Sequence, residues 1–241
     1  MYDLSRFSLG DMIRCGTELR KLGQDAGSME EVAARSVRYL YDSLRAPDLT
    51  APGCVLARIF VTLPYVELDP EQQAFARRLL GDTPATPAMK CLTLLATAGQ
   101  DAAWNSRHTS RGHVALPLPS EDSLARSPMI AQLMRQLGVD IGALIGSDAR
   151  LMVDIDQHTF NVFHVADALG SAFIPAQREF VVPHSVKSVL GFGGLLPNSE
   201  LFATILFTRV TVPRNVADLF QPLALNQKLA MLPFVDRKVF A

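Results

Sequence analysis

The sequence predicts a single α+β domain over residues 1–241, built around an antiparallel-type sheet. Three observations predict this class. Two helical patterns occupy residues 1–50 before any strand pattern begins. The first strand pattern that follows is short and rich in β-branched residues. Residues 180–231 then read as a strand, a turn, a second strand and an amphipathic helix in unbroken succession.

The two opening helices are predicted from the spacing of their apolar residues. In residues 9–22 the apolar side chains recur at 3-4-3 spacing on one side of a helix, and such a seam suits a partner helix. The seam consists of Met12, Cys15, Leu19 and Leu22. A second helix begins after Ser28, an N-cap residue that Glu31 follows at the capping-box position. Its apolar side is formed by Val32, Val37, Leu40 and Leu44.

A strand, a helix and another strand are predicted next. Residues 54–61 are too short and too β-branched for a helix and form the first strand. Asp69 then supplies an N-cap, Pro70 occupies the first helical position, and Gly81 ends this helix. Residues 89–96 form the second strand.

Residues 98–177 are predicted to be an enlarged covering segment inserted within the sheet. The segment begins in a polar, irregular stretch over residues 97–116, and long stretches of this kind are usually functional or disordered. A helix opens at Ser127 and Pro128 and ends at Gly138. Strand-like patterns return at residues 151–155 and 160–165.

The closing unit completes the predicted sheet. Its strands cover residues 188–192 and 201–209, with a turn at residues 197–200. We expect the N- and C-terminal helices to cover one face of the sheet and the covering segment to lie over the other face. A cavity between the sheet and the covering segment is then the default ligand site. The last helix has an apolar side made of Val216, Phe220, Leu223 and Leu229.

The composition argues against several kinds of partner. With 23 Lys and Arg against 24 Asp and Glu, the formal net charge is -1, which removes the long-range attraction needed for nucleic-acid or anionic-membrane binding. No apolar run approaches a membrane span, and the first residues show no signal-peptide pattern, so we expect a cytoplasmic protein. Cys15, Cys54 and Cys91 are too scattered for a disulfide framework or a zinc site.

Several phrases of the sequence resemble a GAF-type domain, of the kind found at the N-terminus of bacterial sensor histidine kinases and of serine-phosphatase or cyclase regulators. The phrases are residues 104–107, 110–113, 128–133, 160–165, 173–177 and 188–194. The general GAF pattern is matched best from residue 180 onward. The resemblance implies a regulatory input domain, usually dimeric, that passes a signal to a downstream kinase, phosphatase or cyclase domain. Since no such sequence follows residue 241, that partner would lie in a longer chain or in a separate protein.

The densest group of functional side chains extends from Trp104 to His113. It offers an indole face and basic groups to an anionic or aromatic ligand, although a solvated loop anchored by a half-buried tryptophan is the alternative. His164 lies in a predicted strand, where a hydrogen-bonded wall residue is the alternative to a ligand contact. The candidate ligand-binding residues are Trp104, Arg107, His113, His164, Gln177 and Phe192.

Metal, phosphate and catalytic sites are disfavoured by the sequence. Its histidines and cysteines show no His-x-x-x-His or Cys-x-x-Cys spacing, so we predict no metal site. Gly191, Gly193 and Gly194 lead into a turn and a strand, and so mark a bulge or a close backbone approach and not a phosphate loop. Cys54, Cys91 and Ser110 lack the surroundings of a catalytic nucleophile, and we predict no catalytic residue.

The sequence therefore predicts a non-catalytic sensory or regulatory domain, which binds an unidentified small molecule and transmits through a dimeric helical interface. Its expected partners are that ligand, a second copy of the chain, and a kinase, phosphatase or cyclase domain. Two alternatives stay open. One is a ligand-free dimerisation or partner-binding module, and the other is a small redox or hydrolytic enzyme. No pattern identifies a cofactor.

Overall fold

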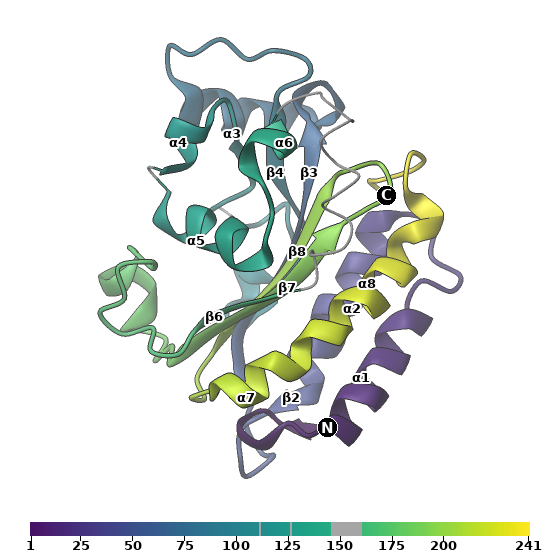
Figure 1. Cartoon of the computed structure of the whole chain (residues 1–241), viewed down its shortest axis with the longest axis vertical. Coiled ribbons are helices and arrows are strands. Elements are labelled where there is room, and N and C mark those ends of the chain that lie inside the picture. The colour runs from purple at the N-terminus through teal and green to yellow at the C-terminus, as the bar shows by residue number, and fades with distance from the viewer. Residues whose placement is uncertain (111, 126, 146–160) are drawn as a thin grey trace.

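The computed structural model describes residues 1–110, 112–125, 127–145 and 161–241. Its centre is one antiparallel sheet, whose strands are β3 (Cys54–Pro64), β4 (Lys90–Gly99), β5 (Ala115–Pro117), β6 (Val162–Val165), β7 (Ser188–Leu195) and β8 (Leu201–Thr208). They lie in the order β5-β4-β3-β8-β7-β6, so the first and last long strands are neighbours at the centre (Figure 1). The predicted α+β class is confirmed.

The helices lie in two layers on opposite faces of this sheet (Figure 1). One layer contains α1 (Leu9–Lys21), α2 (Met29–Ser43), α7 (Arg214–Ala217) and α8 (Gln221–Met231). The other contains α4 (Glu121–Ala125), α5 (Pro128–Leu137) and α6 (Ile141–Ile145). A further helix, α3 (Pro70–Leu80), connects β3 to β4. The predicted placement of the terminal helices on one face and the middle segment on the other is confirmed.

The terminal helices form a helical layer in which α1 packs on α8, while α2 and α8 pack on the sheet. The predicted seam of α1 is used within the chain, because Cys15 and Leu19 are fully buried in the core beneath this layer. On α8 the predicted apolar side is largely confirmed, since Phe220 and Leu223 are buried. Leu229 is an exception, with 36% of its surface exposed.

Local capping chemistry explains several helix ends. The Asp69 side chain accepts a hydrogen bond from the Gln72 amide, the Gln72 side chain bonds back to the Asp69 amide, and Pro70 opens α3 as predicted. Ser28 caps α2 by accepting from the Glu31 amide. The Glu31 side chain instead accepts from the Gly27 amide, so only half of the predicted capping box forms.

One prediction about strand positions is corrected by the structure. A strand precedes the opening helices, because β1 (Tyr2–Asp3) pairs in parallel with β2 (Leu44–Arg45) in a small second sheet. The covering segment, residues 98–177, contributes β5 and β6 to the two edges of the main sheet, and β6 lies within the strand pattern predicted at residues 160–165. The strand expected at residues 151–155 lies outside the described residues.

The glycine-rich part of β7 is a close approach of two backbones and not a bulge. The pairing of β7 with β8 keeps one register from end to end. A β-carbon added at Gly193 would lie 2.2 Å from the carbonyl oxygen of Phe202, so a side chain has no room there.

Candidate functional site

A cavity of about 410 Å³, here called the sheet cavity, lies between the sheet and the middle segment. Its floor includes Leu56 and Arg58 of β3 and Phe207 of β8. The volume is within the range of small-molecule sites, and the walls are mainly apolar. The covering residues include Trp104, His113, Leu116, Met129, Ile130 and Phe180. The structure thus has a cavity at the position that the fold prediction indicated.

Arg58 is the polar centre of this floor, and only 7% of its surface is exposed. Its Nη1 donates to the carbonyl oxygen of Gly112 at 3.2 Å, and its Nη2 donates to the Ser110 hydroxyl at 3.0 Å. The buried Nε has no hydrogen-bond partner. Burial lowers the pKa of Arg58 to about 10, which still leaves the guanidinium charged at neutral pH.

Trp104 and His113 are the two predicted site residues that line the sheet cavity. The Trp104 ring makes edge contacts with Phe180 and His184, with centroid distances of 5.6 and 4.8 Å. Gly99 leaves room for the indole, because an added β-carbon would lie 2.9 Å from that ring. His113 belongs to the exposed residues and has a φ of 58°. The surrounding protein partly desolvates the ring, and this desolvation, together with the charge of Arg58, lowers the pKa of His113.

Arg107 does not line the sheet cavity and instead connects the polar loop to the helical layer. Its guanidinium pairs with Glu30 of α2 at 2.5 Å and with Asp69 at the start of α3 at 2.7 Å. The same group lies over the Phe240 ring, 4.8 Å from its centroid. The chain near Phe240 is held against α2, because the Glu30 amide donates to the carbonyl oxygen of Val239 at 2.8 Å.

The other three predicted site residues lie outside the lining of the sheet cavity. The Nε2 atom of His164 is 2.8 Å from the carbonyl oxygen of Val212, so the His164 ring is hydrogen-bonded to the backbone. Gln177 folds its side chain onto its own loop, and its Nε2 donates to the carbonyl oxygens of Ala168 and Ile174. Phe192 is fully buried on the opposite face of the sheet, beneath the helical layer.

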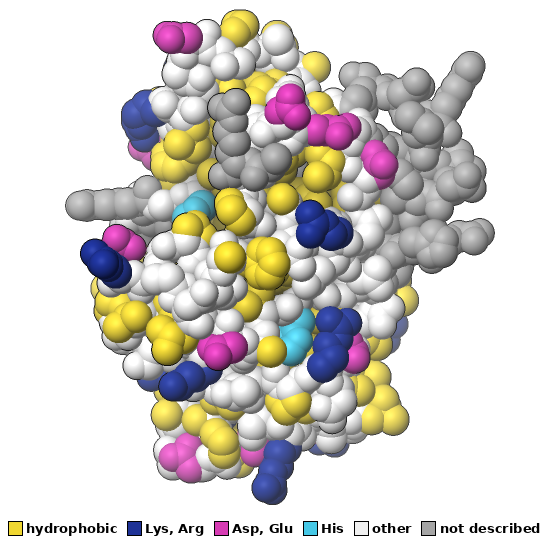
Figure 2. Space-filling model, turned by 60° about the vertical axis from the view of Figure 1, so that its left-hand side comes forward, with side chains coloured by type: hydrophobic (Ala, Val, Ile, Leu, Met, Phe, Trp, Pro, Cys, Tyr) yellow, Lys and Arg dark blue, Asp and Glu magenta, His cyan; other side chains and the backbone are white. Residues whose placement is uncertain are grey.

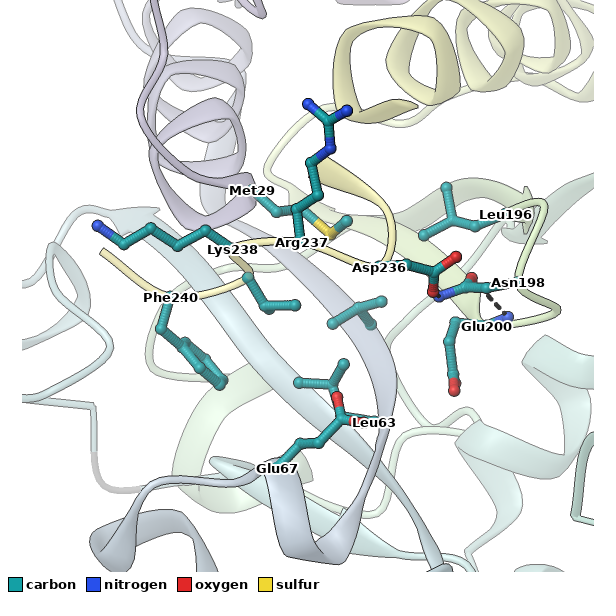
Figure 3. Close-up of a pocket in the computed structure, with 12 residues that line it drawn as sticks. Met29, Leu63, Glu67, Leu196, Asn198, Glu200, Asp236, Arg237, Lys238 and Phe240 are labelled. Atoms are coloured by element: carbon teal, nitrogen blue, oxygen red, sulfur yellow. Dashed lines mark hydrogen bonds between the residues drawn. The ribbon is translucent and has the colours of Figure 1, made fainter. Parts of the chain in front are cut away.

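A second hollow of about 650 Å³ lies beneath the C-terminal tail. Figure 3 shows that Glu200 and Asp236 border this tail pocket from different segments, while Arg237 extends away from it. The buried carboxylate of Glu200 already accepts from Lys90 and from the Thr62 hydroxyl. Because its most buried polar group is satisfied within the protein, the tail pocket offers less for recognition than the sheet cavity.

The nucleophiles considered in the sequence are embedded in structure. Burial raises the pKa of Cys54 and of Cys91 to about 12, so both thiols stay protonated at neutral pH. The Ser110 hydroxyl accepts from Arg58, and no histidine among the described residues hydrogen-bonds to it. Throughout the described part of the chain, no group of three or more His, Cys, Asp or Glu residues could hold a metal ion.

The outer surface of the covering layer is mixed in character. Figure 2 shows hydrophobic side chains reaching this face between basic and acidic groups, with the two signs of charge interspersed. No helix within the described ranges is long and apolar enough to cross a membrane.

Sequence reasoning missed Arg58 although a signal was present. The residue is the one charged side chain within an otherwise apolar strand pattern at residues 54–61. A charge inside a buried strand needs a partner or a function, but the predicted candidate residues came from the polar loop and from residues 164–192.

Comparison with known proteins finds similarity only among solved structures, because no family model and no curated protein matches the chain. The GAF domain of a phosphoenolpyruvate-protein phosphotransferase (ptsP) from Coxiella burnetii is 11% identical, with a TM-score of 0.48 and 95% of each chain covered. The fRMsr of Staphylococcus aureus in its reduced form is 9% identical, with a TM-score of 0.46, 92% of this chain covered and 95% of that chain.

A third similar structure is the chromophore-binding domain of a bacteriophytochrome from R. palustris. It is 10% identical, with a TM-score of 0.42, and the alignment covers 94% of this chain and 62% of that one. At such identities and TM-scores the similarity says nothing about a ligand or an activity, so what the chain binds has to be inferred from its own side chains. A GAF domain is among the solved structures to which the chain is similar.

Proposed function

We propose that this chain is a sensory or regulatory domain that binds a small molecule in the sheet cavity and performs no catalysis. The observation that carries the proposal is the cavity itself, with mainly apolar walls around a buried guanidinium. A ligand-free dimerisation module would be favoured by an interior filled with side chains, and this interior leaves about 410 Å³ open. The protonated thiols of Cys54 and Cys91 and the engaged hydroxyl of Ser110 support a non-catalytic role.

The polar loop at residues 104–113 supplies a route from the cavity to the helical layer. Trp104 and His113 line the cavity, and Ser110 holds Arg58. Between them, Arg107 is paired with Glu30 at the start of α2. A ligand that shifts this loop would therefore change the contacts of Arg107, and a second packing of the helical layer would be the output state.

We further propose a homodimer formed through the outer face of the helical layer, in a protein that works in the cytoplasm. The seam of α1 is buried within the chain, so a dimer would use the outward residues of that helix. Leu9 and Ile13 are 60% and 57% exposed. The proposed receiver of the signal is a kinase, phosphatase or cyclase domain.

Ligand binding is expected to change the fluorescence of Trp104, because it is the single tryptophan of the chain and lines the cavity. A metabolite library screened by thermal shift should yield compounds that raise the melting temperature and shift this emission together. Native mass spectrometry of protein purified from its host should show the bound molecule. A library without any stabilising compound, combined with a consistently empty protein, would count against the proposal.

A cavity-filling variant localises the binding. Ala176 lines the sheet cavity, so Ala176→Phe should abolish the thermal shift and the change in Trp104 emission. Ala172 is exposed on the same loop and does not line the cavity, which makes Ala172→Phe the matched control that keeps both signals. Equal responses from the two variants would place the ligand elsewhere.

The transmission route predicts that Arg107→Gln keeps ligand binding but loses the response of the helical layer to the ligand. This change removes a largely buried charged hydrogen-bond donor and should lower the free energy of unfolding by about 1–2 kcal/mol. Ligand should still bind, but hydrogen exchange at the start of α2 should no longer respond to it. The control is Arg20→Gln on the exposed side of α1, where the ligand-induced change in exchange should persist. An unchanged response in Arg107→Gln would rule out this route.

A further inference from the structure

Arg58 is a buried positive charge that no described carboxylate neutralises. The ion pairs of the described residues involve other arginines and lysines, and both hydrogen-bond partners of Arg58 are neutral oxygens. A guanidinium has five donors, and these two bonds use two of them. Its Nε is buried without any partner. Such burial of a charge is costly unless a partner of opposite sign completes the site.

A second unsatisfied polar atom lies beside this arginine. Thr97 of β4 is the direct cross-strand partner of Arg58, so the two side chains share the cavity face of the sheet. Thr97 is 5% exposed, and its hydroxyl oxygen has no hydrogen-bond partner. Two neighbouring orphan groups on one face indicate a place where a polar part of a ligand is bound.

The remaining walls indicate the rest of the ligand. Leu56 and Phe207, which pair with each other across β3 and β8, form the apolar floor next to Arg58, and Trp104 and Phe180 line the cavity from the covering layer. An aromatic ring or a short aliphatic chain fits such surroundings.

We propose that the sheet cavity binds a monocarboxylate with an apolar or aromatic body, whose carboxylate pairs with Arg58. This inference rests on the proposed function and names the ligand class. A planar carboxylate matches the donor edge of a guanidinium. A phosphate monoester matches the cavity less well than a carboxylate, because it carries close to two negative charges at neutral pH. Arg58 supplies one positive charge, and His113, the other basic group among the described lining residues, is held towards its neutral form.

The test compares acids with their own neutral amides on the wild-type protein by isothermal titration calorimetry. The probes are 3-phenylpropionate and hexanoate against 3-phenylpropionamide and hexanamide, so that aromatic and aliphatic bodies are separated. Each acid that binds should bind about 10- to 100-fold more tightly than its amide, as expected for the loss of charged hydrogen bonds. The ratio of the affinity for each acid to the affinity for its amide should fall towards 1 in Arg58→Gln.

Arg178→Gln is the matched control, because Arg178 is exposed and follows the cavity-lining Ala176 at a distance of two residues. This control should keep the full preference for the acid. Amides that bind as tightly as acids, or a preference that Arg58→Gln retains, would overturn the carboxylate assignment and leave the proposed function standing. If neither the four probes nor any member of the metabolite library binds, the proposed function falls and the ligand class falls with it.

Discussion

Replacing Phe192 with alanine is expected to lower the free energy of unfolding by about 3–5 kcal/mol. Its side chain is fully buried in β7, and its ring lies 6.2 Å from that of Phe220 beneath the helical layer. The deletion leaves a hole in close-packed core, which the surrounding strands and helix fill only in part. Urea unfolding followed by circular dichroism measures the change.

The control for this prediction is Phe173→Ala, because Phe173 is 38% exposed in the covering layer. Phe173→Ala should lower the free energy of unfolding by well under half as much as Phe192→Ala. The acid preference of the sheet cavity should survive in folded Phe192→Ala, since Phe192 faces the other side of the sheet. A small stability loss combined with lost ligand binding would contradict the structure and restore Phe192 as a site residue.

Replacing Lys90 with methionine is expected to lower the free energy of unfolding by about 3 kcal/mol at neutral pH, because the substitution leaves the buried carboxylate of Glu200 without its cation. Glu200 is 5% exposed, and its second oxygen accepts from the Thr62 hydroxyl at 2.5 Å. That hydroxyl also accepts from the Leu201 amide at 2.8 Å, so the cluster is fixed between two central strands. The loss is measured by urea unfolding.

The pH dependence of this loss follows from the direction of the Glu200 pKa. Burial raises that pKa, and the hydrogen bonds from Lys90 and Thr62 only partly oppose it. The native state therefore holds this proton more tightly than the unfolded state, so stability from this group falls as pH rises from about 4.5 through the raised native pKa. Removing Lys90 raises the native pKa further. The stability that Lys90→Met loses relative to the wild-type protein should accordingly become smaller as the pH is lowered towards 4.5.

A double-mutant cycle provides the check on this second prediction. Adding Glu200→Gln to Lys90→Met removes the uncompensated charge and should recover most of the lost stability at pH 7. Glu200→Gln alone should flatten the pH dependence over the same window. A deficit that is equal at pH 5 and pH 7, or a double variant as unstable as Lys90→Met, would show that the charge of Glu200 is not the cause.

The sequence predicted the helices and the layers well, because their signals are local. Asp69 and Pro70 mark the start of α3 whatever the rest of the chain does. Assigning the faces of β7 was a different problem. Every residue of that strand is buried, so no alternation of apolar and polar residues shows which side Phe192 occupies. The sequence therefore does not determine on which face of the sheet Phe192 lies.

The site itself depends on contacts between residues far apart in the chain. Arg58 and Ser110 are 52 residues apart, and Arg107 and Glu30 are 77 residues apart. No local pattern encodes such pairs, although the polar loop was correctly singled out as unusual. The sequence alone could therefore indicate which segment covers the sheet, but not that Arg58 of the sheet lines the cavity.

The division of the sheet cavity between two parts of the fold has an evolutionary consequence. Arg58 is held in the central ladder of the sheet, whereas Met129, Ile130 and Ala176 come from connecting segments outside that ladder. Substitutions in those segments can reshape the pocket without disturbing the hydrogen bonds that keep the strands together. With the proposed carboxylate bound to Arg58, substitutions in the covering segment would change which acid fits the cavity, while the charge of Arg58 would keep the preference for acids.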